Sequence, residues 1–130
     1  MYSATVMEHF MMPRNAWYMA DADGVGCEYD AECGEKFTMF IRVSGDNIRD
    51  ISFLGFGCGA AIAAGSLTTM LAKGKSIRDA LQMTEEEIID ALGGLPEEKR
   101  HCSDLSVSAL HSAILDYLAK QGRSIKEYLS

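Results

Sequence analysis

The chain has few positive charges and no long hydrophobic run. Its 12 Lys and Arg stand against 19 Asp and Glu, which gives a formal net charge of −7. Proteins that neutralise nucleic-acid phosphates need clustered Lys and Arg, so this balance argues against nucleic-acid binding. No segment approaches the roughly 18 consecutive apolar residues that a membrane-spanning helix needs. We therefore expect neither nucleic acid nor a membrane as a partner.

The N-terminal segment also lacks the features of a secretory signal. No basic leader precedes an apolar stretch, and Glu8, His9 and Arg14 interrupt the apolar residues. The sequence therefore predicts a cytoplasmic protein, in which thiols stay reduced. The four cysteines of the chain are Cys27, Cys33, Cys58 and Cys102. In a reducing compartment they are expected to be metal ligands or reactive thiols rather than two disulfides.

What the chain does have is enough apolar sequence for one globular domain. It is 130 residues long, with 48% hydrophobic and 24% charged residues, and it has neither an internal repeat nor a low-complexity linker. A chain of this length buries a sizeable core. We expect residues 1–130 to form a single domain.

Periodic patterns predict strands in the first half of the chain and helices mainly in the second. Residues 37–43 alternate with a period of two, residues 44–47 have turn chemistry, and residues 48–56 form the return strand of a hairpin; a third strand is predicted at residues 24–28. The predicted helices are the first dozen residues capped by Ser3, the stretch after Cys58 up to Gly74, two short segments that begin at Ser76 and Thr84, and residues 103–119. This order predicts an α+β fold, in which helices pack against one face of a small antiparallel sheet.

Three of the cysteines lie where an element begins or ends. Cys33 precedes a strand, Cys58 joins a strand to a helix, and Cys102 lies just before the long helix. The positive end of a helix favours the thiolate, which is the form that binds metals or attacks sulfur. Exposed loops would let a partner's sulfur reach these thiols. Neighbouring glycines would leave room for a cluster or a partner's reactive group; they are Gly34, Gly57 and Gly59.

The spacing of these cysteines argues against the commonest metal motifs. No C-x2-C pair is present, so neither a zinc ribbon nor a plant-type ferredoxin is indicated. There are 24 residues between Cys33 and Cys58 and 43 between Cys58 and Cys102, so the ligands would come from separate loops. The residues by themselves leave two interpretations open: a site for a soft metal, or buried structural thiols.

Five segments, in chain order, resemble the IscU/NifU-type family of iron–sulfur cluster scaffolds: MEHFMMPRNAW, ADADGVG, ECGEKF, FGCGAAIAAGS and LPEEKRHCSDL. The resemblance runs from about Met1 to Leu118 and includes the family's three cysteines, which stand in the contexts C-G-D, G-C-x-A and H-C-S. It implies a compact α+β domain with a three-stranded antiparallel sheet and packed helices. By the same resemblance, Cys33, Cys58 and Cys102 are the cluster ligands.

The function that this resemblance implies is that of a scaffold and not of an enzyme. A cysteine desulfurase would pass sulfur to a scaffold thiol, iron would bind, and a [2Fe–2S] cluster would assemble and be handed to acceptor apo-proteins. Thiolates suit such clusters. Three thiolates plus a weaker fourth ligand would make a site that can both hold and release its cargo.

The chain departs from the family pattern at two places. Glu35 replaces the Asp that usually follows Cys-Gly; we expect it to be the fourth ligand or a gate on cluster release, and the alternative is a solvated carboxylate at the start of a strand. Residues 95–99 read LPEEK, where scaffolds served by an Hsp70-type chaperone resemble LPPVK. Two interpretations of this segment are open: it binds the chaperone, or it is simply a helix-breaking Pro followed by an acidic first turn.

Other residues near the signature also receive expected roles. His101 adjoins Cys102 and is expected either to bind the metal or to position that cysteine. The expected metal is iron, or zinc in the isolated protein. Lys99 would favour the thiolate of Cys102. Cys27 lies outside the signature and is predicted to be a strand thiol, with a role as an extra sulfur acceptor left open.

Two other functions compete with the scaffold. Some relatives resemble zinc-bound sulfur acceptors that stimulate a desulfurase, but that subgroup carries an insertion between its second and third cysteines, and the 43-residue interval here is the shorter, scaffold-like length. A thiol enzyme with Cys102 and His101 as a dyad is disfavoured, because adjacent residues rarely present their side chains to each other.

Overall fold

The structure is a computed structural model that describes residues 2–128. Its antiparallel sheet has the order β1-β2-β3, with β1 (Gly24–Asp30), β2 (Glu35–Ser44) and β3 (Asn47–Phe56). The helices are α1 (Ala4–Met11), α2 (Gly59–Ala72), α3 (Ile77–Leu81), α4 (Glu85–Ala91) and α5 (His101–Lys120), with the 3-10 turns η1 (Glu97–Lys99) and η2 (Ile125–Tyr128). Within the described residues, none of these helices is long and apolar enough to cross a bilayer. The predicted α+β fold with a three-stranded antiparallel sheet is confirmed.

A tight turn joins β2 to β3. Ser44 pairs with Asn47, so Gly45 and Asp46 form a two-residue loop. Both loop residues have positive φ, 58° for the glycine and 64° for the aspartate. Two-residue turns of this kind match the twist of the flanking strands, and Gly and Asp tolerate the conformation better than most residues. The predicted hairpin is confirmed, and its turn sets the register of the β2–β3 pair.

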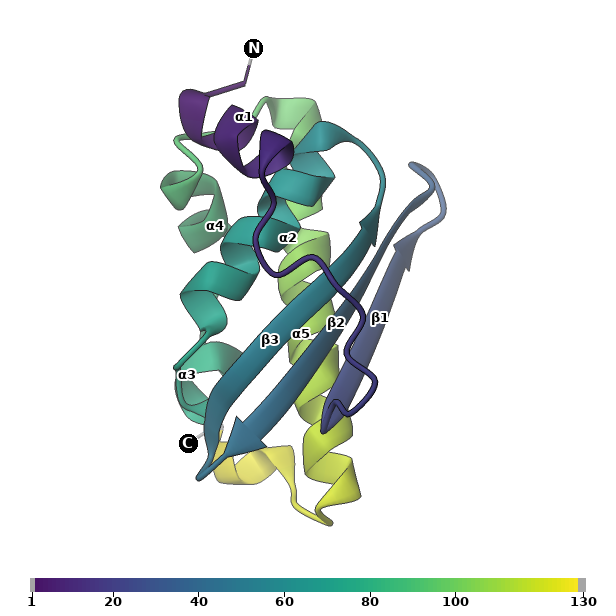
Figure 1. Ribbon diagram of the computed structural model, residues 1–130, viewed down its shortest axis with the longest axis vertical. Helices are drawn as coiled ribbons and strands as arrows, with labels where there is room; N and C mark the ends of the chain where they lie inside the picture. The colour runs from purple at the N-terminus through teal and green to yellow at the C-terminus, as the bar shows by residue number, and fades with distance from the viewer. Residues whose placement is uncertain (1, 129–130) are drawn as a thin grey trace.

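The two long helices, α2 and α5, cover one face of the sheet (Figure 1). Phe37, Met39 and Ile41 point from β2 into this layer and are fully buried. A Cβ atom at Gly24 or Gly26 would stand 2.3 Å from a backbone carbonyl oxygen of α5. The helix therefore lies directly on β1 and runs antiparallel to it, which brings the start of α5 beside the end of β1 (Figure 1).

The segment between α1 and β1 runs across the other face of the sheet (Figure 1). The ring of Tyr18 contacts the ring of Phe40 edge-on, with the centroids 5.4 Å apart. The carbonyl oxygen of Asn15 accepts a hydrogen bond of 2.8 Å from the backbone N–H of Phe53, so the segment also covers the outer edge of β3. The end of β3 lies beyond this cover, and Phe56 there is 74% exposed.

The helix starts agree with the predicted caps except at α5. The side chains of Ser3, Ser76 and Thr84 each accept a hydrogen bond from the backbone N–H three residues later, as N-cap residues do. α5 begins at His101, two residues before the predicted start. Cys102 therefore lies inside the first turn of the helix and not ahead of it.

Candidate metal centre

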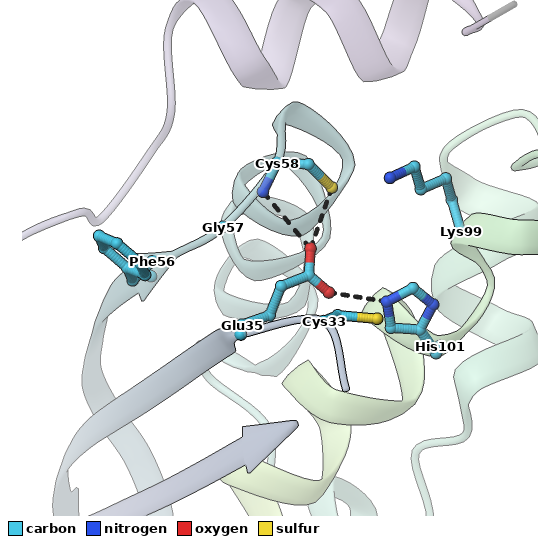
Figure 2. Close-up of a pocket in the computed structure, with 9 residues that line it drawn as sticks. Cys33, Glu35, Phe56, Gly57, Cys58, Lys99 and His101 are labelled. Atoms are coloured by element: carbon cyan, nitrogen blue, oxygen red, sulfur yellow. Dashed lines mark hydrogen bonds and ion pairs between the residues drawn. The ribbon is translucent and has the colours of Figure 1, made fainter. Parts of the chain in front are cut away.

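Three connections bring the predicted ligands to one end of the molecule. Cys33 lies in the turn between β1 and β2, Cys58 is the N-cap of α2, and Cys102 lies in the first turn of α5. The first two cysteines line a pocket of about 490 Å³ together with Glu35 and His101 (Figure 2). The sulfur of Cys102 lies 4.0 Å from that of Cys58. All five residues predicted from the sequence as ligands are thus gathered here.

Glu35 is the centre of this arrangement. Its carboxylate accepts hydrogen bonds from the thiol of Cys58 at 3.0 Å and from the Cys58 backbone N–H at 3.4 Å, and its other oxygen lies 2.7 Å from Nε2 of His101 (Figure 2). Burial would raise the pKa of this carboxyl, but the hydrogen bonds from Cys58 and His101 outweigh burial and hold the pKa below its usual range. Glu35 is only 3% exposed, so the alternative of a solvated carboxylate is wrong.

Cys102 is fully buried. Its sulfur lies 3.6 and 3.7 Å from the two carboxylate oxygens of Glu35. Burial, and after it the neighbouring Cys58 and Glu35, raise the pKa of the Cys102 thiol well above its usual range. The expectation of an exposed loop is therefore wrong for this ligand, and the raised pKa of its thiol opposes the thiolate expected at a helix start.

Lys99 also has a different neighbour from the expected one. Its amine points toward Cys58 (Figure 2), and the charge of Cys58 is the main cause that raises the pKa of Lys99. Lys99 therefore lies beside the thiol at the start of α2. The expected attraction between Lys99 and Cys102 is present but is the smaller effect, and burial outweighs it at the Cys102 sulfur.

Cys33 is the outermost of the three thiols. It is exposed at the mouth of the pocket, on the side of His101 (Figure 2). Loss of hydration, followed by the negative charges of neighbouring carboxylates with Asp30 first, raises the pKa of its thiol. Exposure therefore decreases across the three thiols: Cys33 is exposed, Cys58 is half-buried and Cys102 is buried.

The expected open room beside the thiols is present at Gly34, where an added Cβ would meet nothing within 4 Å, but not at Gly57 and Gly59. Gly34 has a φ of +69°, a left-handed conformation that residues with side chains rarely adopt. A Cβ at Gly57 would lie 2.7 Å from the Cγ of Glu35, and a Cβ at Gly59 would lie 3.3 Å from an aromatic ring of α1. The space on both sides of the second thiol is thus filled by the protein itself, which corrects the expectation.

The inner side chains fit a metal ion in both spacing and chemistry. Around a tetrahedral zinc ion, neighbouring sulfur and oxygen ligands stand about 3.5–3.8 Å apart. The sulfurs of Cys58 and Cys102 and the carboxylate oxygens of Glu35 are separated by 3.0 to 4.0 Å. Thiolate sulfur and carboxylate oxygen both bind zinc, and thiolates hold iron–sulfur clusters. These three residues can therefore bind a metal after small movements.

Two residues outside the predicted ligand set complete the description. Cys27 lies on β1 outside the pocket lining, exposed and 3.7 Å from the hydroxyl of Thr38, which agrees with a strand thiol. Phe56 lines the pocket and is exposed, but the sequence reasoning missed it. The available signal was its position at the end of a strand, two residues before Cys58.

Comparison with known proteins identifies the family. Residues 1–124 match the NifU-like N-terminal domain family. The chain belongs to this family. It is 49% identical over 129 residues to the iron-sulfur cluster assembly scaffold protein IscU 1 of Archaeoglobus fulgidus, covering 98% of this chain and 84% of that protein. It is 46% identical over 124 residues to the iron-sulfur cluster assembly scaffold protein IscU of Aquifex aeolicus, covering 94% of this chain and 79% of that protein.

A solved structure shares the fold. The crystal structure of a nitrogen-fixing NifU-like protein (N-terminal) from Brucella abortus matches with a TM-score of 0.73 at 17% identity, covering 91% of this chain and 94% of that one. The resemblance stated from the five sequence segments is thus confirmed at the level of family and fold.

Proposed function

We propose that this chain is a scaffold on which an iron–sulfur cluster is assembled before transfer to other proteins. Family membership and the names of the two relatives at 49% and 46% identity support this. The observation that carries the proposal is the inner group, in which the sulfurs of Cys58 and Cys102 are 4.0 Å apart and the carboxylate of Glu35 contacts both. A group of this kind beside an exposed thiol suits a cargo that enters and leaves.

The proposed cargo is a labile [2Fe–2S] cluster held by Cys33, Cys58 and Cys102, with Glu35 or His101 completing the ligand set. Thiolates are the usual ligands of such clusters, and a harder oxygen or nitrogen donor in fourth place favours release. Under this proposal the role is non-catalytic: the chain holds the reactants, and release of sulfur from cysteine belongs to the desulfurase. Residues 1–130 are proposed to act as one domain.

Sulfur would reach the pocket from a cysteine desulfurase. A scaffold thiolate attacks the outer sulfur of the enzyme's persulfide, so that a new S–S bond forms on the scaffold while the enzyme's S–S bond breaks and its cysteine thiolate leaves. The transferred sulfur has oxidation state zero, so its conversion to sulfide needs two electrons from a separate reductant. Cys33 is the most exposed of the proposed ligands, so contact with the partner is expected at the mouth of the pocket.

Anaerobic reconstitution tests this function. Metal-free protein is incubated with ferrous iron, cysteine, a desulfurase and a thiol reductant, and visible absorption and circular dichroism follow cluster formation; transfer is then measured with an apo-ferredoxin. We expect a visible chromophore that moves to the acceptor. It should be lost in Cys33→Ser, Cys58→Ser and Cys102→Ser and retained in Cys27→Ser, the matched control.

The competing function is that of a zinc-bound sulfur acceptor. The observation that favours it is the same inner group, whose spacing fits a single tetrahedral zinc ion. A protein that keeps stoichiometric zinc, forms no cluster under these conditions and yet accelerates the desulfurase would replace the scaffold proposal with this one.

Binding of an Hsp70-type chaperone at residues 95–99 stays a prediction. In this segment Pro96 precedes η1, and Glu97 and Glu98 stand in its first turn. A peptide of residues 93–101 that stimulates the chaperone's ATPase would support the prediction, and one that leaves the ATPase unchanged would count against it.

A further inference from the structure

The ligand atoms at the candidate metal centre fall into two groups. The inner group consists of Glu35, Cys58 and Cys102, and the outer group consists of Asp30, Cys33 and His101. Within each group the ligand atoms all lie within 4.8 Å of one another. Asp30 belongs neither to the three-cysteine signature nor to the ligands expected from the sequence. Its presence in the outer group therefore needs its own explanation.

Asp30 is held in place by the turn that it precedes. Its Oδ1 accepts hydrogen bonds from the backbone N–H groups of Glu32 at 3.0 Å and Cys33 at 3.3 Å. Both bonds use the same oxygen, so Oδ2 is not engaged by the turn. After the loss of hydration, the charge of Asp30 is the largest factor that raises the pKa of the Cys33 thiol. The turn thus holds a carboxylate oxygen and a thiol side by side.

His101 supplies the third donor and joins the two groups. Its Nε2 lies 2.7 Å from the carboxylate of Glu35, and its side chain is 30% exposed on the same side of the pocket as the sulfur of Cys33 (Figure 2). Glu35 therefore contacts both groups, the inner one through Cys58 and Cys102 and the outer one through His101.

The donors of the outer group match a particular kind of cation. One oxygen, one sulfur and one nitrogen suit a borderline divalent ion such as Zn²⁺ or Fe²⁺. Ligands around a tetrahedral ion stand about 3.3–3.8 Å apart, so closing the group around a metal needs movements of at most about 1.5 Å. Cys33 is exposed and lies in a turn, so rotation of its side chain can cover this distance.

We propose that Asp30, Cys33 and His101 form an outer site that binds one divalent cation of this kind independently of Cys58 and Cys102. Under the proposed scaffold function, on which this use of the site rests, the outer site receives the iron ion before it reaches the buried inner group. Binding itself requires neither sulfur nor a desulfurase. It can therefore be tested apart from cluster assembly.

Cobalt(II) is the probe, because its visible d–d absorption reports tetrahedral coordination and its charge-transfer band reports a thiolate ligand. The background is the metal-free full chain with Cys58→Ser and Cys102→Ser, which removes both inner thiols; Ser is a preferred N-cap, so α2 keeps its start. The same titrations with Ala in place of Ser at both positions exclude a contribution from the new hydroxyls. In both backgrounds we expect one Co²⁺ per chain with a thiolate band.

Asp30→Asn is the decisive variant. Asparagine keeps a carbonyl oxygen for the two hydrogen bonds of the turn but removes the anionic ligand, so Co²⁺ affinity should fall by about tenfold or more. Glu32→Gln is the matched control, since it removes an exposed charge from the same turn while every donor of the outer group remains. Its affinity should stay at the level of the background.

Two results would overturn the outer site: unchanged affinity in Asp30→Asn, or an equal loss in Glu32→Gln, which would show that only diffuse charge matters. Failure of cluster assembly with Co²⁺ binding intact would instead overturn the proposed scaffold function and leave the outer site standing.

Discussion

Replacing Gly57 by alanine tests whether the position of Glu35 determines metal binding. A Cβ at residue 57 would stand 2.7 Å from the Cγ of Glu35 and 3.0 Å from its Oε2. Non-bonded carbon atoms pack at about 3.5–4.0 Å, so the glutamate side chain must move by roughly 1 Å. Its contacts with Cys58 at 3.0 Å and His101 at 2.7 Å would then exceed hydrogen-bond distance or lose their alignment.

Losses of similar size are expected in metal affinity and in folding stability, from two separate causes. An interaction with a charged group contributes about 1.5–3 kcal/mol, so a carboxylate that no longer reaches the ion should weaken Zn²⁺ binding by about 10- to 140-fold. The free energy of unfolding should also fall, by about 1–3 kcal/mol, because Gly57 has a φ of +158°, a backbone conformation that residues with side chains rarely adopt.

Competition with a chromophoric chelator measures the Zn²⁺ affinity, and urea unfolding measures stability. Gly59→Ala is the control, because its Cβ would meet the ring of Phe10 at 3.3 Å and not the carboxylate. In a Glu35→Ala background, Gly57→Ala should cause no further loss of affinity, since residues that act through one another are non-additive. Full affinity in Gly57→Ala, or an additive loss in the double variant, would refute the reasoning.

Burial also predicts the reactivity of the thiols and a pH dependence of stability. In the metal-free protein a maleimide should modify Cys33 readily and Cys102 only after unfolding in urea, as peptide mass spectrometry can show; fast modification of native Cys102 would contradict its burial. Burial also lowers the pKa of His111, whose Nε2–H donates to the carbonyl of Ala80 at 3.1 Å. The folded state then binds this proton less tightly than the unfolded state, so the free energy of unfolding should fall as the pH drops below about 6.5, by at most about 1.4 kcal/mol per pH unit. His111→Gln should flatten this slope in urea titrations, and an unchanged slope would count against it.

Much of the fold follows from local patterns in the sequence. The hairpin was predictable because strand alternation stops at a Gly-Asp pair that tolerates positive φ, and three helix starts were predictable from their capping side chains. The boundaries differ where tertiary contacts decide. β1 continues to Asp30, two residues past its predicted end, because this residue pairs with Glu35 across the sheet. α5 starts two residues early, and Cys102 in its first turn is fully buried.

The identity of the ligands was more predictable than their surroundings. The cysteine contexts are contained in the sequence, but the burial of Cys102 depends on how α5 packs, which no local pattern reports. One signal was available and not used: Glu35 is in phase with Phe37 and Met39 on β2, so the period of the strand places its carboxylate on the buried face. Asp30 could not be found in this way, because its role depends on where β1 ends and on the turn that follows.

The three thiols are restrained to different degrees. Under the proposed function, this difference affects how the bound cluster leaves. Cys102 is anchored in a helix and fully buried, Cys58 is half-buried with its backbone N–H bonded to Glu35, and Cys33 is exposed in a turn. Motion is easiest where the fewest buried contacts restrain a side chain. An acceptor's thiol that approaches from solvent meets Cys33 first, so ligand exchange would proceed from the exposed to the buried end. The order of release then follows from the gradient of burial, since the residue type is the same at all three positions.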